Sequence, residues 1–182
     1  MSITRRAAIF GGAVAVGAFA QKPTPDRYPD AAPYIPSPME IAEAMLKLAN
    51  VRPDDVVYDL GSGDGRVVVM AAQKFGASAV GVEIDSDLVR DARQRAQKAG
   101  VSGKVRFIES DLFETDLRPA SVVTLYLLPK TVDRLKPKLL AELKPGARIV
   151  SFSFPFTGWP PAKVEDVNSR KLYLWIVPER SK

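Results

Sequence analysis

The stretch that decides the fold is Val56-Val57-Tyr58-Asp59-Leu60-Gly61-Ser62-Gly63-Asp64-Gly65-Arg66, which continues into Val67-Val68-Val69-Met70-Ala71-Ala72. Its first part is short, apolar and β-branched, which predicts a buried strand. Three alternate glycines follow, and after them the chain has helical character. A strand, a glycine turn and a helix in this order bring bare backbone close to a ligand at the carboxyl end of a parallel strand. The stretch therefore predicts a ligand-binding turn in an α/β fold.

Two kinds of ligand suit such a turn: a dinucleotide and S-adenosylmethionine. The dinucleotide fingerprint G-x-G-x-x-G requires a small residue where this chain has Arg66, and Asp64 would place a carboxylate beside a pyrophosphate. S-adenosylmethionine carries no phosphate, and its sulfonium and ammonium groups tolerate a nearby carboxylate. The turn therefore favours S-adenosylmethionine, with a glycine turn that serves only the fold as the alternative.

The composition indicates one compact domain. The chain has 182 residues, 46% of them apolar, which is enough for a single sizeable core. It has no cysteine and no histidine, which excludes disulfides and thiolate metal sites and removes the usual general base and the commonest metal ligand. We expect no metal site. The net charge of +5 is mild and spread along the chain, so we expect no nucleic-acid partner.

Residues 1–20 have the pattern of a targeting segment. Arg5 and Arg6 precede an apolar run over residues 7–20, which ends in an A-x-A sequence typical of a cleavage site. The arginine pair is similar to a twin-arginine export signal. We favour a cleaved signal peptide; a membrane anchor and a start codon set too early are the alternatives. The location therefore stays open between export, inner-membrane anchoring and the cytoplasm.

A proline-rich linker is predicted over residues 21–37, and the folded domain over residues 38–182. Six of the fifteen prolines lie between residues 22 and 38, which favours an extended, stiff chain. Ser37, followed by Pro38 and Glu40, predicts an N-cap with a capping box at the start of the first helix of the domain.

Strands and helices alternate over the rest of the domain, which predicts a parallel sheet with helices on both faces. We predict strands at residues 56–60, 79–85, 105–108, 121–128 and 148–154, with helices at 38–50, 66–75, 87–99 and 131–143. Two short antiparallel strands at 163–168 and 171–177 complete the sheet without a preceding helix. Ser86 is expected to cap the third helix, and Pro137 to interrupt the fourth. The fold class is α/β, Rossmann-like and doubly wound, with a mostly parallel sheet and a shortened carboxyl-terminal end.

Acidic residues lie at the ends of the first three predicted strands. In a doubly wound sheet the ligand lies outside the carboxyl ends of the central strands. Asp59 lies beside the glycines, and Glu83 is placed to accept hydrogen bonds from ribose hydroxyls. Asp111 is placed to receive an adenine amino group, with Leu112 or Phe113 packing on the ring. Each acid alone could be a helix cap or a solvated charge, but the three strand ends together are more specific.

These observations predict one set of cofactor-binding residues. It comprises Tyr34, Asp59, Gly61, Ser62, Gly63, Asp64, Gly65, Glu83, Ile84, Asp111 and Leu112. Residues 33–36 either lie over the cofactor as a lid or form a hydrophobic staple for the first helix. Asp85 is left out of the set, because its role could be limited to supporting the start of the next helix.

The order Asp59–Gly65, Glu83, Asp111 and Val122–Pro129 resembles class I, or seven-stranded, S-adenosylmethionine-dependent methyltransferases over residues 38–182. Shorter motifs resemble one family more narrowly: the lysine methyltransferases of ATP synthase c-subunit and adenine nucleotide translocase, with their short prokaryotic relatives. These motifs are Tyr34-Ile35-Pro36-Ser37-Pro38, Tyr58-Asp59-Leu60-Gly61-Ser62-Gly63-Asp64-Gly65-Arg66, Leu125-Tyr126-Leu127-Leu128-Pro129, and Val150-Ser151-Phe152-Ser153-Phe154-Pro155 with Trp159. Members of that family carry an amino-terminal membrane-targeting segment, in keeping with residues 7–20.

The resemblance implies methyl transfer from S-adenosylmethionine to a lysine of a protein, with S-adenosylhomocysteine as product and membrane association through residues 7–20. Such a transfer needs alignment and desolvation of the amine more than a general base. Tyr126 and Trp159 are the candidates for lining the substrate channel, although both could be core aromatics. A small-molecule methyltransferase and a non-catalytic S-adenosylmethionine-binding module are the alternatives. The sequence predicts no oligomeric state.

Methylation of nucleic-acid bases is disfavoured by a missing motif. Amide and adenine N-methyltransferases carry Asn/Asp-Pro-Pro-Tyr after the fourth strand, where this chain has Tyr126-Leu127-Leu128-Pro129.

Overall fold

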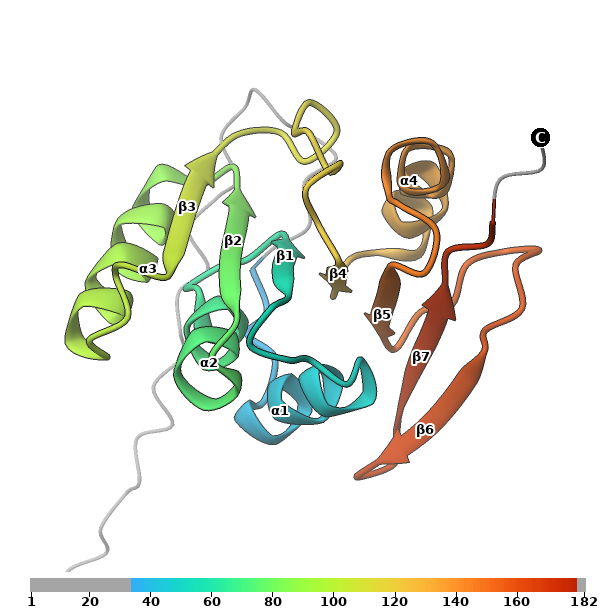
Figure 1. Ribbon diagram of the computed structural model, residues 1–182, viewed down its shortest axis with the longest axis horizontal. Coiled ribbons are helices and arrows are strands. Elements are labelled where there is room, and N and C mark those ends of the chain that lie inside the picture. The colour runs from blue at the N-terminus through green and yellow to red at the C-terminus, as the bar shows by residue number, and fades with distance from the viewer. Residues whose placement is uncertain (1–33, 180–182) are drawn as a thin grey trace, which may run out of the picture.

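In the computed structural model, which describes residues 34–179, seven strands form one sheet with helices on both faces (Figure 1). The strands are β1 (Val56–Leu60), β2 (Ser78–Glu83), β3 (Val105–Glu109), β4 (Val122–Leu125), β5 (Arg148–Phe152), β6 (Lys163–Val167) and β7 (Arg170–Ile176). The helices are α1 (Met39–Leu48), α2 (Arg66–Phe75), α3 (Ser86–Lys98) and α4 (Pro129–Glu142). The strand order is β3-β2-β1-β4-β5-β7-β6, in which β7 runs antiparallel to β5 and β6 and the other pairs are parallel. This arrangement confirms the predicted fold class.

The predictions for residues 1–20 and for most of the linker lie outside the described residues. Within residues 34–179, no helix is both long enough and apolar enough to cross a bilayer.

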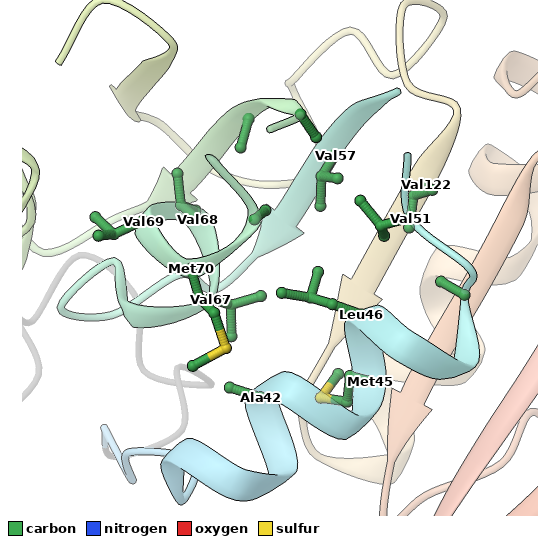
Figure 2. Close-up of a cluster of buried hydrophobic side chains, with 14 of the residues drawn as sticks. Ala42, Met45, Leu46, Val51, Val57, Val67, Val68, Val69, Met70 and Val122 are labelled. Carbon is green, nitrogen blue, oxygen red and sulfur yellow. The ribbon is translucent and has the colours of Figure 1, made fainter. Parts of the chain in front are cut away.

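Two hydrophobic cores lie on opposite faces of the sheet. The first joins α1, α2 and α3 to the sheet; Figure 2 shows Ala42, Met45 and Leu46 of α1 facing Val67 and Met70 of α2. The second core lies under α4, whose buried leucines pack on β1, β4 and β5. Alternation along β1 divides its side chains between the two cores, and this buries both faces of the strand. Such burial fixes where the carboxyl end of β1 meets the glycine turn.

Both predicted serine caps are wrong. Pro38 occupies the N-cap position of α1, and the carbonyl of Ser37 instead accepts a hydrogen bond from Arg66 at 2.7 Å. Ser86 is the first residue of α3, and Asp85 caps the helix by accepting from the amides of Asp87 and Leu88 at 2.8 and 3.3 Å. A carboxylate is a strong acceptor at a helix amino terminus, because the helix dipole favours negative charge there.

The fourth strand is shorter, and the following helix more continuous, than predicted. β4 ends at Leu125, and the chain leaves the sheet before Pro129 begins α4. Pro137 lies inside this helix without ending it. Its exposed ring lies between the turns that bury Leu135 and Leu139, and their packing offsets the roughly 3 kcal/mol that an interior proline costs.

A buried ion pair lies at the end of the sheet opposite the glycine turn. This ion pair leads to a prediction about stability. Arg148 binds the carboxylate of Asp55 and donates to the carbonyls of Ala49 and Asn50 at 2.9 and 3.0 Å. Arg148→Ala is expected to lower the free energy of unfolding by about 3 kcal/mol, because it takes the opposite charge from the buried carboxylate of Asp55 and leaves it only hydrogen bonds from Ser121 and Arg52. Urea denaturation measures the loss. Lys163→Ala, in an exposed pair with Glu165, is the control, and an equally small loss for both variants would contradict the prediction.

Candidate functional site

The glycine turn bridges the carboxyl ends of β1 and β2. The amides of Gly61 and Ser62 both donate to the carbonyl of Val82, at 2.9 and 3.0 Å. Gly61, Gly63 and Gly65 have φ angles of +78°, +52° and +75°, which side-chain-bearing residues rarely adopt. The spacing of the glycines therefore follows from the backbone path of the turn, and Gly65 ends it as the N-cap of α2.

Side chains from two other segments lie close to the backbone of the glycine turn. A Cβ atom on Gly61 would lie 2.8 Å from Leu127, which follows β4, and one on Gly63 would collide with the ring of Tyr34. The turn therefore lies between the segment that precedes α1 and the segment that follows β4. Tyr34 is thus in contact with the glycine turn.

Glu83 ties the end of β2 to the turn. Its Oε2 accepts a hydrogen bond from the amide of Gly63 at 2.8 Å. Its Oε1 accepts from the amides of Ile84 and Asp85, at 2.7 and 3.1 Å. These bonds hold the carboxylate in one orientation while leaving part of its acceptor capacity for a ligand.

Asp59 is buried, and its side chain is bound by the hydroxyl of Thr124, which donates to Oδ1 at 2.6 Å. Burial raises the pKa of Asp59 to about 7; the Thr124 hydrogen bond opposes this rise, and the charges of Glu83 and Asp64 add to it. Sequence reasoning missed Thr124, which lies on a different strand and faces Asp59 in the register of β1 and β4.

The raised pKa of Asp59 predicts a pH dependence of stability. The unfolded chain loses this proton near pH ~4, whereas the folded protein keeps it to about pH 7. Because the folded state binds more protons in this window, the contribution of Asp59 to stability falls as pH rises. Asp59→Asn keeps the oxygen that accepts from Thr124 but does not titrate. From pH 5 to pH 8 its free energy of unfolding should therefore rise by roughly 2 kcal/mol relative to that of the wild type. Urea denaturation at both pH values measures this, and a constant difference would contradict it.

Asp64, predicted to bind the cofactor, lies in a cluster of charges. Its carboxylate pairs with Arg66 at 2.8 Å and with Arg95 of α3 at 2.5 Å. Burial raises the pKa of Asp64, but the hydrogen bonds and charge of Arg66 and the charge of Arg95 outweigh it, so the pKa is lowered overall. Sequence reasoning missed both arginines as partners. Arg66 was visible only as a departure from the dinucleotide fingerprint.

The loop after β3 is braced by its own hydrogen bonds. The side-chain Oδ1 of Asp111 accepts a hydrogen bond from the amide of Phe113 at 2.9 Å. The backbone carbonyl of Asp111 accepts one from the hydroxyl of Thr115 at 3.2 Å. Leu112 packs on the core under α4. The guanidinium of Arg134 in α4 lies 3.9 Å from the centre of the Phe113 ring, which links the loop to that helix.

The two predicted channel aromatics lie on opposite faces of the sheet. Tyr126 packs on Phe152, with ring centres 4.4 Å apart, beside the core of α1 to α3. Trp159 packs with Phe156 and Trp175 beside the α4 core, at 5.2 and 6.0 Å. The structure does not bring these two residues together, and Tyr126 directly precedes the residue that touches Gly61.

The site fits S-adenosylmethionine better than a pyrophosphate. Carboxylates of Asp59 and Glu83 lie next to the bare backbone of the turn, and a buried hydroxyl, Ser62 Oγ, has no hydrogen-bond partner within residues 34–179. The cationic side chain that enters the turn, Arg66, is bound by Asp64 and by a backbone carbonyl. In the same residues, no cluster of three or more acidic side chains could hold a metal ion. Fold and site together define a class I, S-adenosylmethionine-dependent methyltransferase.

Comparison with known proteins gives the family. The ANTKMT methyltransferase domain matches residues 59–163, and the chain belongs to this family. The protein-lysine N-methyltransferase of Saccharolobus islandicus is 45% identical over 152 residues, covering 81% of this chain and 94% of that protein. The adenine nucleotide translocase lysine N-methyltransferase of Mus musculus is 38% identical over 145 residues, which is 80% of this chain but 63% of the mouse protein. The chain therefore spans nearly all of the first relative and less of the second.

A solved structure gives the same result for fold and cofactor. A Salinibacter ruber protein described as an RNA methyltransferase, in complex with S-adenosyl-L-homocysteine, has a TM-score of 0.79 and 47% identity to this chain. The match covers 81% of this chain and 97% of that one. The protein is thus an S-adenosylmethionine-dependent methyltransferase, as its sequence predicted.

Proposed function

We propose that the protein transfers a methyl group from S-adenosylmethionine to the side-chain amine of a lysine in another protein. The observation that carries the proposal is the 45% identity to a protein-lysine N-methyltransferase, in a match that covers 94% of that protein. The membership of the ANTKMT domain family supports it further.

The chemistry of the site supports an amine acceptor. The sequence has no histidine, and the acids nearest the glycine turn are engaged: Asp59 by Thr124, Glu83 by three amides and Asp64 by two arginines. Among residues 34–179, these acids at the turn are therefore each bound by other groups of the protein. An acceptor that loses its proton to water before the transfer suits such a site.

The segment after β4 supplies the surroundings that such an acceptor needs. Deprotonating lysine at neutral pH costs about 4 kcal/mol, given an ordinary pKa of ~10.4. Leu127 lies against the glycine turn, between the aromatic Tyr126 and the apolar Leu128 in sequence, and apolar surroundings favour the uncharged amine. We propose that Tyr126 lines the acceptor channel, and we keep Trp159 as a second candidate.

For the cofactor, we propose the residues predicted from the sequence. Glu83 would accept from the ribose hydroxyls, Asp111 would receive the adenine amino group and Leu112 would pack on the ring, while the glycine turn lies against the amino-acid part. S-adenosylmethionine supplies an activated methyl group on its sulfonium. The protein's own residues bind and orient the two reactants and exclude water.

We also propose the domain organisation predicted from the sequence. Residues 1–20 would be a signal peptide or membrane anchor, residues 21–37 a linker, and residues 38–182 the methyltransferase domain. The Arg5-Arg6 pair and the apolar residues 7–20 support a membrane-associated protein substrate. Tyr34 and Ser37, at the end of the linker, already contact the domain.

A second candidate function is RNA methylation, which the description of the Salinibacter ruber relative favours. One experiment separates the two. Purified full-length protein and radiolabelled S-adenosylmethionine are added to membrane and soluble lysates from cells lacking the gene, and the label is followed into protein, RNA and small molecules. Alkali-resistant label in a protein band would support lysine methylation. Label confined to RNA or to small molecules would contradict it, and binding without transfer would indicate a non-catalytic module.

A further inference from the structure

Residues 34–37, here called the strap, cross the glycine turn just before α1. Within residues 34–179, no backbone–backbone hydrogen bond outside helices and strands involves the strap. The side chain of Arg66 makes the connection instead. Its Nη1 donates to the carbonyl of Ser37 at 2.7 Å, and its Nη2 lies 3.4 Å from the hydroxyl of Tyr34. One guanidinium therefore contacts both ends of the strap.

The guanidinium of Arg66 is itself held in place by Asp64. Nε and Nη2 of Arg66 donate to the two carboxylate oxygens of Asp64, at 2.9 and 2.8 Å, in the bidentate geometry that fixes an arginine most firmly. Arg95 of α3 donates to the carbonyl of Asp64 at 3.0 Å and to its carboxylate at 2.5 Å. Asp64 thereby anchors Arg66 to the body of the domain.

The strap in turn places the ring of Tyr34 on the turn. The ring lies so close to Gly63 that a Cβ there would collide with it. The amide of Gly63 donates to Glu83. Tyr34, Gly63 and Glu83 are therefore consecutive members of one contact chain, which begins at Arg66 and ends at the carboxylate predicted to bind ribose.

We propose that Arg66 is a positioning residue for S-adenosylmethionine. It fastens the strap across the glycine turn, and Tyr34, so held, forms a wall of the cofactor site. Asp64 serves the same unit by orienting Arg66. The wall is preorganised by this cluster, which lowers the ordering cost of binding. This inference rests on the cofactor and not on the identity of the methyl acceptor.

Isothermal titration of full-length variants with S-adenosylhomocysteine tests the proposal without an acceptor. Arg66→Ala and Tyr34→Ala should each weaken binding roughly tenfold, which corresponds to about 1.4 kcal/mol. The double variant should bind about as weakly as the weaker single variant, because both changes open the same strap. Arg118→Ala, which breaks an exposed ion pair with Asp116, is the control and should stay near the wild type.

A second measurement separates positioning from loss of fold. Chymotryptic cleavage after Tyr34 should accelerate in Arg66→Ala, while the circular dichroism of the domain stays as in the wild type. Tyr34 is 38% exposed, so Tyr34→Ala tests the wall even where Arg66→Ala does not fold. Wild-type affinity in both single variants would overturn the proposal. So would losses that multiply in the double variant, or chymotryptic cleavage after Tyr34 that Arg66→Ala leaves unchanged.

Discussion

Glu83→Ala is expected to weaken binding of S-adenosylhomocysteine at least ~100-fold while the domain stays folded. We propose that its carboxylate accepts a charge-assisted hydrogen bond from the ribose, worth about 1.5–3 kcal/mol, and a loss of about 3 kcal/mol is a factor of ~100. The variant also removes the acceptor of the Gly63 amide, so the turn loses its tie to β2. Titration calorimetry measures the affinity, and circular dichroism verifies the fold.

Glu109→Ala is the matched control for this change. Glu109 ends the neighbouring strand β3, pairs with Glu83 in the sheet register and is exposed. The variant should therefore bind S-adenosylhomocysteine as the wild type does. Equal affinity of Glu83→Ala and Glu109→Ala would show that the ribose carboxylate has been assigned to the wrong residue.

Gly63→Ala is expected to have the second-largest effect. The new methyl group would collide with the ring of Tyr34, and the φ angle of +52° adds strain of about 1–2 kcal/mol. Tyr34 has to move away from the turn, and we expect cofactor affinity to fall at least about tenfold, the equivalent of ~1.4 kcal/mol. Titration with S-adenosylhomocysteine measures the loss.

Gly100→Ala separates the two causes. Gly100 follows α3 with a φ angle of +70°, but a Cβ there would meet nothing within 4 Å. This variant carries the backbone strain without the collision, so it should lose stability and keep its affinity for S-adenosylhomocysteine. The same affinity in both alanine variants would mean that contact with Tyr34 has no part in binding.

The fold could be predicted because its signals are local. The run from Val56 to Leu60 is apolar at most of its positions, as expected of a strand buried on both faces, and the structure buries it so. The second helix was predicted to end at residue 75 and does so, with Gly76 as its C-cap. Pro137 misled the prediction, because the packing of α4 on the sheet outweighs a propensity that is read from sequence alone.

The positions of site residues could be predicted only where each lies at the end of a single strand. Asp59 lies near the end of β1, Glu83 ends β2 and Asp111 follows β3, so their positions at one edge of the sheet could be inferred. Their partners could not. The amide of Gly63 meets Glu83 across 20 residues, and Arg95 meets Asp64 across 31. Such contacts depend on how α3 and the turn pack together, which no local pattern contains.

The central claim, methylation of a protein lysine, is tested most directly by the chemical identity of the labelled product. Protein labelled by the full-length enzyme with radioactive S-adenosylmethionine is hydrolysed completely, and its amino acids are separated. We expect that the label elutes with N-methylated lysine and that Glu83→Ala yields none. Label in any other amino acid, or in nucleosides from the same reaction, would contradict it.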